Sequence, residues 1–151
     1  MYRARQRRPG ATVVESAFVY PALFLLLLGL MVGAAGIFRY SQLASLAREG
    51  ARYACVHGGQ YAQEMGVTAP TADQIFNNVI APMAAAFDTT QISYAITYNA
   101  SNYPYATTID ANNNVVPIQN TVTVTLTYVW VPEAFLGGIT LTSTSVMPMS
   151  Y

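Results

Sequence analysis

Residues 10–38 read GATVVESAFVYPALFLLLLGLMVGAAGIF, and this stretch decides the fold. No residue from Ser16 to Phe38 is charged, and residues 23–28 are all leucine apart from Phe24. In an α-helix, about 22 residues rise about 33 Å, which is enough to cross a hydrocarbon core of about 30 Å. The stretch therefore predicts a transmembrane helix.

Two other structures could give such an apolar run. A buried core helix is one, but a chain of 151 residues could hardly cover the run on all sides. A cleaved secretory signal is the other, because Gly33–Gly36 offers small residues for a cut after Ala35. That cut would divide one long helix, since apolar residues keep helical spacing from Phe38 up to Gly58 and Gly59. An uninterrupted membrane anchor fits this pattern best.

The charges around the run are distributed unevenly. All seven basic residues are arginines: four lie within the first eight residues, and the others are Arg39, Arg48 and Arg52. No Lys or Arg follows Arg52, whereas five acidic residues do. Basic residues beside a span are retained in the cytoplasm, so the sequence predicts a cytoplasmic N-terminus and an extracytoplasmic body. An arginine-rich head in front of a span favours this anchor over a nucleic-acid partner.

The residues beyond the span alternate in the ways that helices and strands require. Thr71–Gln74 predicts a capping box that opens a helix. Its expected apolar side consists of Ile75, Phe76, Val79, Ile80, Met83 and Phe87, and Pro82 is expected to bend or end it. Strands are predicted over residues 91–98, 121–131 and 139–147, with a short hairpin near residues 112–114 inside a long loop. The predicted fold is α+β: a long helix that continues as a stalk into a small antiparallel sheet packed with a helix.

No catalytic constellation is expected. Cys55 and His57 are the single cysteine and histidine, and two residues apart on a helix they diverge. The acidic residues of the body lack a paired spacing, and no nucleophile elbow or phosphate loop is present. We therefore predict a protein that is not an enzyme and has no cofactor or metal site.

Two positions in the span stand out chemically. Glu15 is a carboxylate at the mouth of an apolar helix, where an ionised acid costs on the order of 3 kcal/mol at depth. Its position alone leaves a headgroup-level acid and a functional acid equally possible. Pro21 removes one backbone donor and predicts a kink.

A basic leader ending in Gly10, four small or apolar residues, Glu15 and an apolar helix together resemble a class III type IV prepilin N-terminus. The resemblance implies that a prepilin peptidase cuts between Gly10 and Ala11 on the cytoplasmic face. Glu15 would then be the fifth residue of the mature chain. A neighbouring subunit would pair its carboxylate with the new α-ammonium group, which would fix the register of assembly.

Two segments resemble the TadE-like family in particular. They are residues 14–21, VESAFVYP, and the segment of Arg48, Glu49, Gly50, Ala51 and Arg52 after the span. Ser16 departs from the larger residue common in the family. Within a helix, Gly50 costs about 1 kcal/mol relative to alanine, so close packing is expected there. Arg48, Glu49 and Arg52 are candidates for contact with lipid headgroups or a partner carboxylate, and a solvated face is the alternative.

The resemblance implies a minor pilin or pseudopilin that takes part in assembly, secretion, surface adhesion and biofilm formation by a tight-adherence (Tad, type IVc) pilus. Its expected partners are other pilin subunits, the prepilin peptidase, the Tad inner-membrane assembly platform and membrane lipid, and its expected location is the bacterial inner membrane or the pilus. The expected divisions are a leader at 1–10, a transmembrane helix at 11–38, a stalk at 39–58 and an extracytoplasmic domain at 59–151. The alternative is an uncleaved single-pass envelope protein whose body is a binding module.

Overall fold

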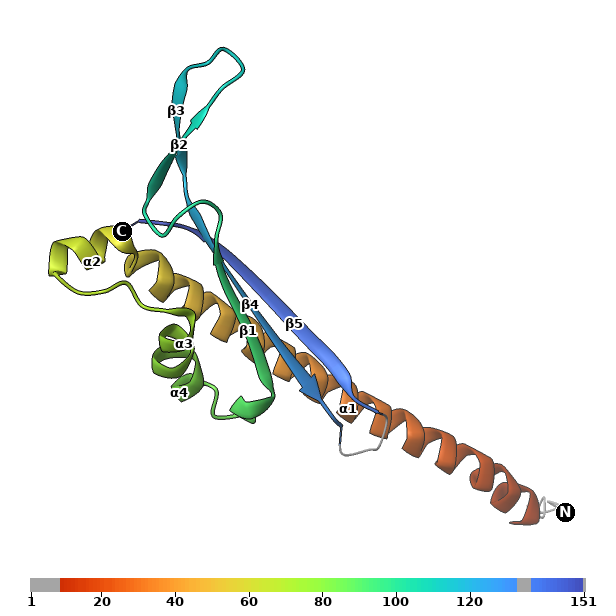
Figure 1. Ribbon diagram of the computed structural model, residues 1–151. Coiled ribbons are helices and arrows are strands. Elements are labelled where there is room, and N and C mark those ends of the chain that lie inside the picture. The colour runs from red at the N-terminus through yellow and green to blue at the C-terminus, as the bar shows by residue number, and fades with distance from the viewer. Residues whose placement is uncertain (1–8, 133–136, 151) are drawn as a thin grey trace, which may run out of the picture. The chain divides into compact units, whose positions relative to one another are not determined.

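The computed structural model describes residues 9–132 and 137–150 (Figure 1). The four leader arginines and Glu133 therefore lie outside the described residues, as does most of the expected leader. The chain divides into two compact units, Met1–Ile37 and Phe38–Tyr151. The predicted α+β fold is confirmed, because a long apolar N-terminal helix is followed by antiparallel strands and short helices.

Helix α1 extends from Pro9 to Val56 and takes part in both units. In the first unit its large apolar side chains are exposed on every side, with Phe18 77% and Met31 75% exposed. A helix that is apolar all round requires an apolar environment such as a bilayer. Among the described residues, α1 alone is long and apolar enough to cross a membrane.

Pro21 lies inside α1, and the helix continues on both sides of it. It therefore does not end the first turns of the helix. The kink at Pro21 stays a prediction.

The second unit is built on a three-stranded antiparallel sheet of order β1-β4-β5. The strands are β1 (Ile92–Tyr98), β4 (Thr121–Trp130) and β5 (Ile139–Pro148). In β4 the apolar residues predicted to alternate are all buried: Val122, Val124, Leu126, Tyr128 and Trp130. The intervening threonines lie on the opposite face of the sheet, where the hydroxyls of Thr125 on β4 and Thr144 on β5 lie 3.0 Å apart. The strand pattern is thus as predicted.

The C-terminal half of α1 belongs to the core of this unit. Its buried residues are Leu43, Leu46, Ala47, Gly50, Ala51, Ala54 and Cys55. Residues 39–58, expected to form a stalk, thus supply a helical layer of the body as far as Val56. Helix α2 (Gly59–Met65) follows immediately.

The helical segment after residue 71 begins as predicted and then changes register. Thr71 and Gln74 form the reciprocal capping box that opens α3 (Ala72–Ile75). A π-helical turn, η1 (Phe76–Ile80), then leads into the short α4 (Ala81–Met83). The segment ends one residue after Pro82, which agrees with the expected stop.

The expectation that Met83 faces the core is wrong, since its side chain is 57% exposed and Ala84 is buried instead. Met83 is the last residue of α4, and the buried face continues from Ile80 to Ala84, the C-cap residue four positions later. Tyr94 ties this segment to the sheet, because its hydroxyl donates to Asp73 at 2.7 Å and its ring stacks on Phe76. The bond to Asp73 raises the pKa of Tyr94.

The loop after β1 carries the predicted hairpin, and its strands are longer than expected. They are β2 (Tyr105–Ile109) and β3 (Val115–Gln119), paired in register from Tyr105 with Gln119 to Ile109 with Val115. The turn between them is held by Asp110, whose carboxylate accepts from the backbone N–H groups of Asn112 and Asn114. These two strands form an arm that extends away from the three-stranded sheet (Figure 1). Most side chains of the arm are exposed.

Candidate functional site

The start of α1 presents the residues expected to carry processing and assembly. The helix begins at Pro9, so Gly10 lies in its first turn and the Glu15 side chain is exposed in the second. The Ala11 nitrogen and Glu15 are four residues apart, which places them on one helix face about 6 Å apart along the axis. One end of the helix therefore presents the nitrogen that cleavage would free together with the carboxylate expected to bind such a nitrogen.

The apolar part of α1 offers a surface on which another helix can pack. A methyl group added at Gly29 or Gly33 would meet no atom within 4 Å. Glycines in spans let neighbouring helix backbones approach closely. The surface of the first unit is thus apolar, with glycines that let another helix approach and one exposed acid, Glu15, near its start.

The segment from Arg48 to Arg52 has two different sides. Gly50 and Ala51 are buried, whereas Arg48 and Arg52 are exposed and Glu49 is half-buried. A Cβ atom at Gly50 would lie 2.8 Å from Cδ1 of Ile80 and 3.5 Å from Cγ1 of Val124. The close packing expected at Gly50 is confirmed. Because small residues hold this side of the helix against η1 and β4, the two arginines project outward as a pair.

Arg48 keeps part of its charge close to the helix, since its Nε donates to the Ala44 carbonyl at 3.3 Å. This bond leaves the two terminal nitrogens of the guanidinium directed outward, and a guanidinium can bind a carboxylate or phosphate with two parallel hydrogen bonds. The described geometry fits either of the partners expected from sequence.

Arg39 makes contacts that the sequence did not reveal. Its Nη1 donates to the Ala86 carbonyl at 3.1 Å, and its guanidinium carbon lies 5.8 Å from the centre of the Trp130 ring. A cation at this distance from an indole face is attracted by the ring. The available signal was a lone cation at the end of an apolar run and a lone tryptophan at the end of a strand, but nothing in the sequence pairs them.

Cys55 and His57 do not converge on a common site. His57 stacks on Tyr53 with ring centres 3.9 Å apart, and Nδ1 lies 3.0 Å from the Tyr53 carbonyl oxygen. The buried Cys55 thiol donates to the Arg52 carbonyl, while the Cys55 carbonyl accepts from the backbone N–H of Ser150. These contacts close the end of α1 and hold the C-terminal segment against it. Within residues 9–132 and 137–150, no three His, Cys, Asp or Glu side chains are grouped as metal ligands.

The predicted site residues therefore fall into two groups that belong to different units. Gly10, Ala11, Glu15 and Pro21 lie in the first unit, whereas Arg48, Glu49 and Arg52 lie in the second. The roles assigned to them remain predictions.

Comparison with known proteins identifies one family. The model described as TadE-like protein matches residues 10–52, so the match begins at Gly10 and ends at Arg52. It covers Glu15, Pro21 and the outward arginine pair, and it leaves the strands outside. No curated protein and no solved structure matches the chain.

Proposed function

We propose, from the TadE-like identity of residues 10–52, that the chain is a minor pilin or pseudopilin of a Tad (type IVc) pilus. TadE-like proteins are Tad pilus-associated and are not known as enzymes. In this proposal, prepilin peptidase cuts between Gly10 and Ala11, and the mature chain takes part in pilus assembly, secretion and surface adhesion. The observation that carries the proposal is the match itself, which contains the spacing from Gly10 to Glu15 and the segment from Arg48 to Arg52.

The geometry of α1 supports a role for Glu15 in assembly. An exposed acid at the start of an apolar helix needs water or a cation when the helix leaves the membrane surface for a filament. An α-ammonium group at Ala11 of a neighbouring subunit would supply that cation in one register only. Each charge would then offset the burial cost of the other.

The chain is a single-pass membrane protein of a pilus system. Its proposed location is the inner membrane, with the N-terminus in the cytoplasm and the second unit outside it. There the prepilin peptidase and the Tad assembly platform meet the first unit, and other pilin subunits meet both. The outward pair of Arg48 and Arg52 offers a binding site for a carboxylate of such a partner or for a lipid headgroup.

The first experiment determines the N-terminus of the protein purified from its host by mass spectrometry. We expect a chain that begins at Ala11, and we expect Gly10→Val to leave the full-length chain uncut, because a branched side chain obstructs the cleaved bond. A natural chain that begins at Met1 would instead indicate the uncleaved anchor. A chain that begins at Gly36 would indicate ordinary signal cleavage.

The second experiment replaces Glu15 by glutamine, which keeps the size of the side chain and removes its charge. We expect normal membrane insertion and a decrease of about tenfold or more in incorporation into the pilus or its assembly complex. Leaving one partner of a buried ion pair unpaired costs about 3–5 kcal/mol, more than enough for that decrease. The matched control is Glu64→Gln, an exposed acid of α2. Equal incorporation of the two variants would contradict the assembly role of Glu15.

A further inference from the structure

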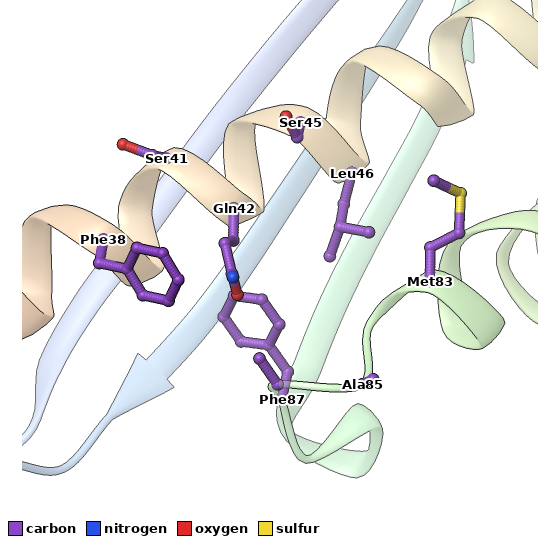
Figure 2. Close-up of a pocket in the computed structure, with 9 residues that line it drawn as sticks. Phe38, Ser41, Gln42, Ser45, Leu46, Met83, Ala85 and Phe87 are labelled. Atoms are coloured by element: carbon purple, nitrogen blue, oxygen red, sulfur yellow. The ribbon is translucent and has the colours of Figure 1, made fainter.

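A groove runs along the second unit between the early part of its helix α1 and the segment after α4. It has a volume of about 430 Å³. Figure 2 shows Phe38, Gln42 and Leu46 on the helix side, with Met83 and Phe87 opposite them. Phe38 and Met83 are 61% and 57% exposed, so apolar side chains on both sides of the groove are accessible to a ligand.

The chemistry of the groove favours an apolar, uncharged ligand segment. Its lining holds no charged side chain, and its polar groups are Ser41, Ser45 and Gln42. The volume lies in the usual range for small-molecule sites, about 300–1,000 Å³. Met83, the last residue of the short α4, is exposed on the lip of the groove.

A cation stands beside this apolar groove. Arg39 follows Phe38 directly, and its guanidinium donates to the carbonyl of Ala86, which itself lines the groove. A ligand with an anionic group joined to an apolar chain would place the anion at Arg39 and the chain along Phe38 and Met83. A phospholipid has this composition.

The position of the groove in the chain points to the same ligand. Phe38 is the residue next after Ile37, the last residue of the apolar unit, and successive Cα atoms lie about 3.8 Å apart. The first residue that lines the groove therefore follows the last residue of the span. Lipid surrounds a membrane span, so lipid is available to the groove.

Other side chains around Arg39 suit the same environment. Its ring partner Trp130 pairs with Ile139 at the end of the sheet, where Val129, Val131 and Ile139 are 45%, 62% and 44% exposed. These exposed aliphatic side chains favour an apolar environment at this end of the sheet, while Trp130 itself is only 6% exposed. The exposed carboxyl of Asp88 limits how deeply this end can be immersed, because an ionised acid is costly in hydrocarbon.

We propose that the groove binds an acyl chain of a bilayer phospholipid, with the lipid phosphate at Arg39. This holds the end of the second unit formed by Phe38, Met83 and Trp130 against the membrane surface. The inference goes beyond the proposed pilin function and depends only on the chain being a membrane protein, so a failed cleavage or assembly test leaves it standing.

The test uses the full chain in nanodiscs with one copy per disc and lipids brominated on the acyl chains, which quench tryptophan on contact. Trp130 is the only tryptophan, so it can be moved. In the Trp130→Phe background, Met83→Trp places the probe on the lip of the groove. Tyr105→Trp, which is 67% exposed in the native chain, places it on the β2–β3 arm as the matched control. We expect emission at residue 83 to be at least halved in brominated discs, and emission at residue 105 to be almost unchanged.

Equal quenching at the two positions, or none at residue 83, would overturn the proposal. A blue shift at residue 83 that requires several copies per disc and occurs without quenching would identify a second copy of the chain as the occupant, which also overturns it. The same probe at residue 83 tests the phosphate contact, because the native Trp130 is only 6% exposed and brominated acyl chains do not reach it. In discs of anionic brominated lipid, adding Arg39→Gln should weaken the quenching at residue 83. Full quenching in the Arg39→Gln chain would contradict the assignment of the phosphate to Arg39.

Discussion

The two halves of α1 have the same helical backbone but different surroundings. From Thr12 to Ile37 the helix carries large apolar side chains that are exposed on all sides, among them Phe18, Leu25 and Met31. From Phe38 to Val56 one side of the helix, which carries leucines and small residues, is buried in the body, and Arg48 and Arg52 lie on the exposed side. The first half therefore depends on its environment for stability, whereas the second half depends on contacts within its own chain.

This difference explains why one family match can span both halves. Residues 10–52 contain a surface for lipid and partner helices and also the piece of α1 that anchors the body. Close packing requires Gly50 and Ala51, while the outer face is free to carry Arg48 and Arg52. A mutation should therefore affect a different property in each half: assembly in the first half and folding in the second.

The largest expected difference concerns leucine. Leu43 is fully buried in the body, and Leu26 is 58% exposed in the first unit. We expect Leu43→Ala to lower the free energy of unfolding of the body by about 2–5 kcal/mol, since it leaves a cavity in a packed core. Leu26→Ala should change it by less than about 0.5 kcal/mol. Urea unfolding of the full chain in detergent micelles, followed by Trp130 emission, measures both values. Similar losses in the two variants would show that the halves do not differ as described.

The second difference concerns glycine. Gly50→Val inserts a branched side chain where a Cβ atom already lies 2.8 Å from Cδ1 of Ile80, so we expect overpacking to cost about 1–3 kcal/mol. Gly33→Val is the matched control, because a Cβ atom there meets no atom within 4 Å. The same urea unfolding measurement should show no loss for Gly33→Val. A loss of stability in Gly33→Val would mean that this part of α1 is packed within the chain.

Local rules predicted much of the molecule correctly. The capping box at Thr71 and Gln74, the alternation in β4 and the close packing at Gly50 each depend on neighbouring residues or on one helix face. Such features are encoded within a few residues and need no knowledge of the tertiary contacts.

The errors and omissions have a different origin. Met83 was assigned to the core by α-helical spacing, but the helical segment ends there and Ala84 is buried in its place. The contact of Arg39 with Trp130 joins residues far apart in the sequence, and no pattern in either segment specifies the other. The candidate site was predictable where it lies in one helix, around Gly10 and Glu15. The groove beside Phe38 was not predictable, because two segments far apart in the sequence form it.

The smallest expected difference concerns exposed acids. Glu15 is one in the first unit, and Asp88 is one in the body. Hydrogen bonds from the Thr90 hydroxyl at 2.6 Å and its backbone N–H at 3.0 Å lower the pKa of Asp88 below 3.8. Because the folded-state pKa is lowered, the stabilising contribution is complete above pH 3.8 and is lost as the pH falls through the folded-state value. The carboxyl is fully exposed, so solvent keeps this contribution small.

Thr90→Val removes the hydroxyl bond and leaves the backbone bond in place. We expect the pKa of Asp88 to rise toward its ordinary value, as measured by the carboxyl carbon chemical shift of the full chain in micelles during an acid titration. Asp110 is the internal control, because its pKa is lowered by the backbone N–H and side chain of Asn114 and should not respond. An unchanged Asp88 midpoint in the Thr90→Val chain would show that the hydroxyl bond does not hold the carboxylate.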